Sequence, residues 1–193
     1  MKLAVFDFDK TITTQDSFMA FILYVHGKSK LLRGLFILLP TLISYFIKLV
    51  PNDQAKQKVF NYFWGGWPKE KLESVAKDFS SQALAHLVKK SAVEKIEWHK
   101  KQGHKVVVVS ASLNCYLEPW CQTHHLDLIC TEVEYLNGLV TGRFLTKNCY
   151  AQEKVQRLKA KYHLSDFEYI YVYGDGRGDK EMLEMADESH PRP

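Results

Sequence analysis

The sequence predicts an α/β fold: a doubly wound, Rossmann-like parallel sheet interrupted by a helical insertion. An apolar run at residues 3–6 is typical of a buried strand, and the almost wholly β-branched run at 105–109 is typical of a central one. A third strand-like run covers residues 169–173. Helical patterns separate the three runs, and strands that alternate with helices in this way indicate a parallel sheet covered by helices.

Length and charge limit the domain organisation and the partners. The chain has 193 residues, enough for one core and a smaller appendage, and we assign the core to residues 1–14 and 89–193 and the appendage to 15–88. Residues 14–88 hold nine Lys/Arg and five Asp/Glu, a surplus of four that equals the formal net charge of +4. These basic residues form no dense stripe, which disfavours a nucleic-acid partner.

Cysteine usage bears on the compartment. The four cysteines form no C-x-x-C pair and show no zinc-ligand spacing, so we expect isolated buried thiols in a reducing compartment. The sequence enters its first strand directly, without the pattern of a signal peptide. We therefore expect a cytoplasmic protein.

Helical patterns fill the insertion. Asp16 is placed to cap a helix over residues 17–26, which Gly27 ends. A second helix starts at Pro51 and stops at the glycine pair 65–66, and a third opens at residues 67–68 with apolar residues at helical spacing. We expect the aromatic residues of this region to form the core of the insertion: Phe60, Tyr62, Phe63, Trp64 and Trp67.

One apolar segment of the insertion has two interpretations. Residues 34–47 contain no charged side chain, and Pro40 interrupts them. Such a segment is too short to cross a bilayer as a helix, which takes roughly 20 residues. We expect two short helices buried against the rest of the insertion. The alternative is an interfacial hairpin that dips into a membrane, with Arg33 and Lys48 at the lipid headgroups.

The second half of the chain returns to alternating elements. Ser91 and Glu94 have the spacing of a capping box, and the helix that they open runs to residue 102, before Gly103. Asn137-Gly138, between apolar runs, is a strong hairpin signal. The other expected elements are helices over 114–123, 151–162 and 179–186, and hairpin runs over 126–134 and 139–144.

Polar residues follow three strands at the point where each strand ends. Asp7 and Asp9 lie one residue apart after the first strand, so their side chains share a face, and Ser110 and Asp175 follow the other two. In open α/β sheets, ligands bind beyond the carboxyl ends of the strands. Oxygen ligands without a nearby His or Cys suit a hard cation such as Mg²⁺, and Ser110 with the amides that open the next helix suits a phosphate oxygen.

These motifs resemble those of the haloacid dehalogenase (HAD) superfamily. Asp7-Phe-Asp9-Lys-Thr11, a strand ending in Ser110, then Lys154 and finally Gly174-Asp175-Gly-Arg-Gly-Asp179 follow the order of that superfamily along the whole chain. The chain most resembles subfamily IB, the phosphoserine phosphatase-like members, whose helical C1-type cap is inserted just after the first motif. The resemblance implies a HAD core with the insertion as its cap.

The resemblance also implies catalytic roles. Asp7 would attack phosphorus and form an aspartyl-phosphate, and Asp9 would protonate the leaving oxygen and then activate water. Mg²⁺ would be held by the Asp7 carboxylate, the Asp9 backbone carbonyl and Asp175. The second aspartate favours phosphoryl transfer over dehalogenation, because a halide leaving group needs no proton.

The other motif positions would bind or support the phosphate. Ser110, the Ala111 amide and Lys154 would bind it, and Thr11, Gly176 and Asp179 would support the site, Asp179 by orienting the lysine or metal-bound water. Three positions depart from the pattern. Lys10 and Gly178 stand where relatives carry glycine and asparagine, and Asp16 stands where phosphoserine phosphatases carry a glutamate that reads the substrate, so Asp16 is a candidate substrate ligand as well as a helix cap.

The cap leaves the substrate open between several classes. It is long, apolar and net basic, and it resembles that of bacterial phosphatidylglycerophosphate phosphatases, which favours a lipid phosphate. Phosphoserine or another small soluble phosphomonoester is the alternative, and transfer to an acceptor other than water is a further one. A non-catalytic relative that only binds phosphate or membrane is disfavoured, because all four motif aspartates are present. Contact of the cap with lipid would place this cytoplasmic protein peripherally at the inner membrane face.

Overall fold

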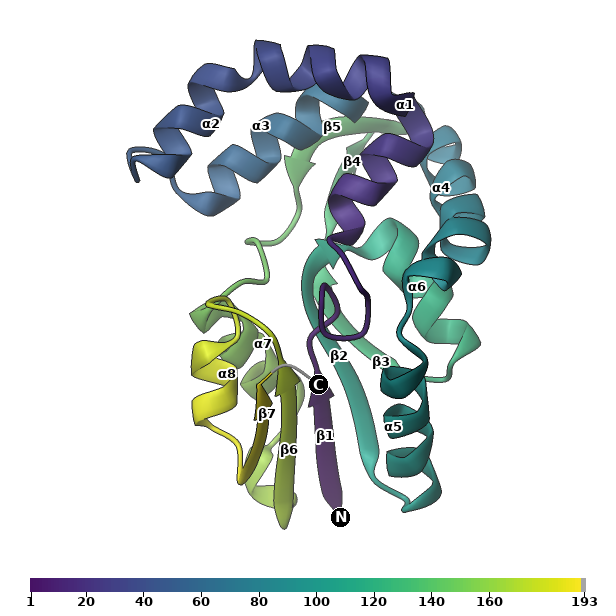
Figure 1. Cartoon of the computed structure of the whole chain (residues 1–193), viewed down its shortest axis with the longest axis vertical. Helices are drawn as coiled ribbons and strands as arrows, with labels where there is room; N and C mark the ends of the chain where they lie inside the picture. The colour runs from purple at the N-terminus through teal and green to yellow at the C-terminus, as the bar shows by residue number, and fades with distance from the viewer. Residues whose placement is uncertain (192–193) are drawn as a thin grey trace.

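A computed structural model describes residues 1–191 and contains a five-stranded parallel sheet of order β3-β2-β1-β6-β7 (Figure 1). Every neighbouring pair in this sheet runs parallel, as the sequence predicted. The edge strand β7 was not expected. The strands are β1 (Lys2–Phe6), β2 (Lys105–Leu113), β3 (Asp127–Thr131), β6 (Tyr169–Gly174) and β7 (Glu188–Pro191).

Helices cover both faces of the sheet because its central strands are apolar on both sides. Ala4 and Phe6 pack toward α5 (Lys90–Lys101) and α6 (Asn114–Thr123). Leu3 and Val5 pack on the other face, toward α7 (Gln152–Lys161) and α8 (Lys180–Glu184). The alternation of side chains along β1 therefore divides the core into two apolar layers, which is the doubly wound arrangement.

The inserted residues form a helical layer beyond the carboxyl ends of the strands (Figure 1). Asp16 caps the first helix, since its Oδ1 accepts a hydrogen bond of 2.8 Å from the Met19 amide. At Gly27 the backbone is non-helical (φ 71°, ψ 172°), so the first helical stretch ends there, as predicted, and a second stretch continues to Ile37. The layer consists of α1 (Ser17–Ile37), α2 (Leu39–Phe46), α3 (Asn52–Trp64), α4 (Lys69–Asp78), a π-helical turn (Phe79–Ala83) and a 3₁₀ turn (Leu84–Leu87).

The predicted aromatic core of this layer is confirmed. Phe60, Phe63 and Trp64 are buried, and the Phe21 ring stacks on Trp64 with a centroid distance of 5.0 Å. Aromatic packing of this kind provides much of the apolar burial of a small layer. It fixes α1 on α3.

A hairpin from the later part of the chain completes the helical layer. β4 (Val133–Leu136) and β5 (Leu139–Phe144) pair in antiparallel fashion around the predicted Asn137-Gly138 turn. The expected first hairpin run is split, because its beginning forms β3 in the main sheet. The hairpin binds the helical layer through backbone hydrogen bonds of 2.8 Å from the Gly66 amide to the Val140 carbonyl and from the Val140 amide to the Trp67 carbonyl.

The expectation that residues 34–47 are buried is wrong. They form two short helical stretches around Pro40, as expected, but α2 has no buried residue. Phe36 and Phe46 are 78% and 77% exposed. The reason is that α2 packs on the layer along one side only. No single helix within residues 1–191 has the length and apolar character to span a bilayer, whereas α1 and α2 taken together, with a 63° bend, meet that criterion.

The predicted capping box is also wrong. Helix α5 begins at Lys90 with Lys89 as its N-cap, so Ser91 lies inside the first turn and caps nothing. Tertiary pairing sets this start: the Lys89 amide donates to the Ile12 carbonyl at 2.8 Å, and Val88 pairs with Thr13. These contacts hold the chain extended up to Lys89.

Replacing Gly142 by alanine is expected to lower the free energy of unfolding by about 3 kcal/mol or more. Gly142 has a φ of 80°, and a Cβ there would lie 1.9 Å from Oδ1 of Asn61 on α3. Gly138→Ala is the matched control, because its φ of 76° imposes a similar backbone cost while the space around it is open. Urea unfolding measures both, and equal losses would show that the hairpin does not press on α3.

Candidate active site

A cavity of about 410 Å³ lies at the carboxyl ends of β1, β2 and β6, beneath α2 and α3. Eight of the ten predicted site residues line it: Asp7, Asp9, Asp16, Ala111, Lys154, Asp175, Gly176 and Asp179. Two others, Ser110 and Thr11, are fully buried behind its wall. The fold therefore brings together residues that are up to 172 positions apart in the sequence, from Asp7 to Asp179.

A buried lysine joins two aspartates on the cavity floor. Lys154 Nζ donates hydrogen bonds to Asp7 Oδ1 at 2.5 Å and to Asp179 Oδ1 at 2.6 Å. The second oxygen of Asp179 accepts from the amides of Asp175 and Gly176, at 3.1 and 3.2 Å. Helix α7 carries Lys154, the loop after β6 carries Asp179, and Asp7 follows β1, so this bridge fixes the first two segments against the end of β1.

The buried charges shift one another's pKa. Burial raises the pKa of the Asp7 carboxyl, Lys154 opposes that rise, and the charges of Asp179 and Asp9 add to it. Burial by itself would lower the pKa of Lys154, but the carboxylates of Asp7 and Asp179 outweigh it and leave the pKa above its ordinary value. The lysine therefore remains a cation, and it partly neutralises the carboxylates of Asp7 and Asp179 on the cavity floor.

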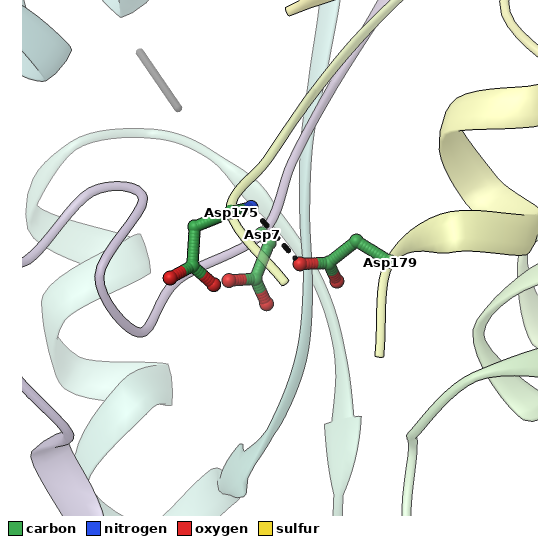
Figure 2. A group of neighbouring side chains, drawn as sticks. All are labelled: Asp7, Asp175 and Asp179. Carbon is green, nitrogen blue, oxygen red and sulfur yellow. Dashed lines mark hydrogen bonds between the residues drawn. The ribbon is translucent and has the colours of Figure 1, made fainter. Parts of the chain in front are cut away.

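Three carboxylates could hold a metal ion. Oxygens of Asp7, Asp175 and Asp179 all lie within 4.8 Å of one another, with Asp7 between the other two (Figure 2). An oxygen-only donor set of this charge fits Mg²⁺. The cluster contains Asp179, which the sequence assigned a supporting role, and it does not contain the Asp9 side chain. For Asp9 we had expected a backbone carbonyl ligand.

The Asp9 carboxylate is held at the side of the cavity by the insertion and by β2. Its Oδ1 accepts from the Ser17 amide at 2.6 Å, and its Oδ2 accepts from Ser112 Oγ at 2.5 Å. Burial raises the pKa of Asp9, and the charge of Asp16 adds to the rise. Ser112 was missed in the sequence, although its position two residues after Ser110 on the same strand was a usable signal.

Ser110 and Thr11 do not reach the cavity. Ser110 Oγ accepts a hydrogen bond of 3.0 Å from the Ser112 amide, and so supports the residue that holds Asp9. The buried hydroxyl of Thr11 has no hydrogen-bond partner in residues 1–191. The wall at the end of β2 is formed by Ala111 and Ser112.

A second lysine enters the cavity from the helical layer and was also missed. Lys56 Nζ, from α3, donates to the Ala111 carbonyl at 2.5 Å and lies 5.2 Å from the centroid of the Phe18 ring. Burial lowers the pKa of Lys56, and the charges of Asp9 and Asp16 oppose that shift. The sequence offered no signal, since Lys56 and the exposed Lys58 stand two residues apart on one helical pattern.

The positions that depart from the family pattern have structural explanations. Lys10 is exposed and has a φ of 62°, a conformation that glycine adopts most easily. A Cβ at Gly178 would lie 2.4 Å from Cε2 of Tyr150, so the tyrosine ring occupies the space that a side chain at 178 would need. Asp16 caps α1 and also lines the cavity, so its two interpretations are compatible.

Comparison with known proteins agrees with this geometry. The family model of haloacid dehalogenase-like hydrolases matches residues 4–184. Protein CicA of Caulobacter vibrioides is 31% identical over 192 residues, which cover 96% of this chain and 83% of CicA. A probable phosphatase of Mycobacterium tuberculosis is 28% identical over 195 residues, which cover 95% of this chain and 66% of that protein.

The fold is shared with a solved phosphoserine phosphatase, captured as an analogue of its phospho-aspartyl intermediate. The TM-score is 0.68 at 18% sequence identity, covering 97% of this chain and 84% of that one. The parallel sheet and the acidic cavity at its carboxyl edge thus define a hydrolase of the HAD type. The chain belongs to the haloacid dehalogenase-like hydrolase family.

Asp175→Asn should abolish stabilisation by Mg²⁺. At 100 times its dissociation constant, an ion that binds only the folded protein adds about 2.7 kcal/mol to the free energy of unfolding. The variant loses one of three clustered carboxylates, so we expect its metal-free stability to be kept or raised while the Mg²⁺-dependent increase disappears. Thermal unfolding with and without Mg²⁺ measures this.

Asp166→Asn is the matched control, because Asp166 is exposed in the 3₁₀ turn Leu164–Asp166, outside the cavity. It should keep the full response to Mg²⁺. An unchanged response in Asp175→Asn would place the metal elsewhere.

Proposed function

We propose that this hydrolase is a Mg²⁺-dependent phosphatase that cleaves phosphomonoesters through an aspartyl-phosphate on Asp7. The observation that carries the proposal is the cavity floor, where Lys154 holds Asp7 from one side and Asp9 stands two residues away on a separate support. The family, the mycobacterial probable phosphatase and the structural likeness to phosphoserine phosphatase support phosphatase activity.

In the first step, a carboxylate oxygen of Asp7 attacks phosphorus. The new bond joins Asp7 to phosphorus, the bond between phosphorus and the ester oxygen breaks, and the departing oxygen takes a proton from the Asp9 carboxylic acid. Ser17 and Ser112 hold Asp9 in place at the side of the cavity, which orients it for this proton transfer.

In the second step, the Asp9 carboxylate takes a proton from water as the water oxygen attacks phosphorus. The bond from Asp7 to phosphorus breaks, inorganic phosphate leaves, and both aspartates return to their starting states. Lys154 stabilises the negative charge on Asp7 and the phosphoryl oxygens throughout. Mg²⁺ held by Asp7, Asp175, Asp179 and the Asp9 carbonyl would supply further neutralisation of that charge.

We assign phosphate binding to Lys154 and the Ala111 amide, with Lys56 as an additional cation. Ser110, expected as a phosphate ligand, is fully buried, and we propose that it supports the wall by holding the Ser112 amide. Lys56 approaches from α3 to the Ala111 carbonyl, so it stands next to the phosphate end of the cavity.

For the substrate we favour a phosphate ester on an amphiphile. Apolar side chains of the helical layer form the outer part of the cavity: Phe18, Met19, Leu42, Tyr45 and Val59. Phosphoserine is the second candidate, because Asp16 and Lys56 on the same wall have charges opposite to its ammonium and carboxylate groups.

The test is Mg²⁺-dependent phosphate release from phosphatidylglycerophosphate in micelles, from phosphoserine and from p-nitrophenyl phosphate. We expect turnover by the wild type, with the lipid preferred, and a loss of at least about 1,000-fold in Asp7→Asn, which lacks the nucleophile. Absence of turnover on all three substrates would contradict the phosphatase proposal. Preference for phosphoserine would move the assignment to the second candidate.

Asp9→Asn is the mechanistic control in that experiment. It should slow alkyl esters more than the nitrophenyl ester in the first step, because nitrophenolate leaves without a proton. An equal loss for both esters would show that Asp9 acts only on water.

Lys56→Met is expected to raise KM about 10-fold with a smaller effect on kcat, because a charge-assisted hydrogen bond contributes roughly 1.5–3 kcal/mol. Lys58→Met is the matched control, since Lys58 is exposed two residues further along α3 and does not line the cavity. Steady-state kinetics on the preferred substrate measure both variants. Identical KM values for the two variants would show that Lys56 does not bind the substrate.

A further inference from the structure

We propose that the outer side of α2 and of the second half of α1 is a docking face for the surface of an anionic lipid bilayer. The docking face consists of Leu32, Phe36, Leu39, Ile43 and Phe46. Figure 1 shows these helical segments at the outer rim of the helical layer, away from the sheet.

Exposure and spacing identify the face. Its five side chains are between 47% and 78% exposed, and Ile47 and Leu49 after α2 are 60% and 74% exposed. Leu32 and Phe36 are four residues apart on α1, and Leu39, Ile43 and Phe46 are four and three residues apart on α2, so within each helix they share one side. Soluble monomers seldom expose contiguous apolar patches beyond a few hundred Å², and larger ones mark interaction sites.

The positive charge around the docking face favours an anionic lipid surface as its partner. Residues 17–52 contain no Asp or Glu and hold four cations: Lys28, Lys30, Arg33 and Lys48. All four are exposed, and none forms a salt bridge within the described chain. An apolar face flanked by unpaired cations is the pattern of an interfacial helix on anionic lipid. A second copy of the chain is a poor occupant, because two such faces would repel each other.

The start of α1 keeps the segment on the membrane surface. Phe18, Phe21 and Ile22 are buried in the core, and the Ser17 amide is bound to Asp9. A spanning arrangement of α1 and α2 would extract these residues and dismantle the wall of the active site. The docking face therefore lies in the interface and does not cross the bilayer.

The docking face and the cavity share α2. Leu42 and Tyr45 line the active-site cavity, and the adjacent Ile43 and Phe46 face outward. Docking would hold one side of the cavity at the level of the lipid headgroups. A phosphate ester embedded in the bilayer would then enter without leaving the surface, and this consequence, unlike the docking itself, rests on the proposed function.

Vesicle flotation tests the docking face directly. The protein is mixed with vesicles of phosphatidylcholine alone or of phosphatidylcholine with about 30% phosphatidylglycerol, since each Lys or Arg near an anionic surface contributes about 1 kcal/mol. We expect binding to the anionic vesicles, weakened by salt. The double variant Phe36→Ser/Phe46→Ser and the quadruple variant with Lys28, Lys30, Arg33 and Lys48 changed to Gln should each bind at least about 100-fold more weakly.

The matched control is Leu136→Ser/Leu145→Ser, which removes two exposed apolar side chains (61% and 65%) from the β4–β5 region. It should bind like the wild type. Hydrolysis of p-nitrophenyl phosphate in solution should be unchanged in Phe36→Ser/Phe46→Ser, which shows that the fold and site are intact.

Three outcomes would overturn the docking face. They are no binding by the wild type, equal binding by the Phe36/Phe46 and control variants, and sedimentation as a dimer that the Phe36/Phe46 variant abolishes. Vesicle binding without turnover of any phosphate ester would instead support the docking face and contradict the proposed function.

Discussion

The bridge from Lys154 to Asp7 and Asp179 is the constraint on which the site depends. Three clustered carboxylates and one ammonium lie at or near the buried floor, where an unpaired charge would cost several kcal/mol. The lysine must therefore be delivered accurately, and Ala151 adopts a φ of 52° directly before α7 while its amide donates to the Gly178 carbonyl. A non-glycine residue held in this region costs roughly 1–3 kcal/mol, which the surrounding contacts offset.

A second set of contacts ties the helical layer to the same floor. Asp9 follows β1, yet both of its oxygens are occupied by groups outside the first motif: the amide that opens α1 and the hydroxyl of Ser112 at the end of β2. Any movement of α1 relative to the sheet would disturb the proposed acid. The helical layer therefore forms one wall of the site, and its position affects the proposed acid. The same layer brings Lys56 of α3 into the cavity.

Sequence reasoning succeeded where a local pattern determines a tertiary result. The parallel strands were readable because β1 and β2 are apolar on both faces, and Asp7 and Asp175 could be brought together because parallel strands end at one edge. It failed where contacts between residues distant in the sequence determine the local structure. Ser91 has the spacing of a cap, yet pairing of Val88 and Lys89 with the first loop fixes the start of α5. Lys56 could not be told from Lys58 without the packing of α3.

Residues 34–47 are a second case in which the sequence pattern did not predict burial correctly. Apolar composition alone favours burial, but a helix that packs along one side buries only the residues on that side. Leu42 and Tyr45 account for the inner side of α2. Phe36 and Phe46 gain little from folding, since a mostly exposed apolar side chain contributes little of the ~25 cal/mol per Å² that burial provides. Polar residues would serve the fold equally well at these positions, so the stability of the chain does not account for them, whereas the proposed docking to a bilayer would.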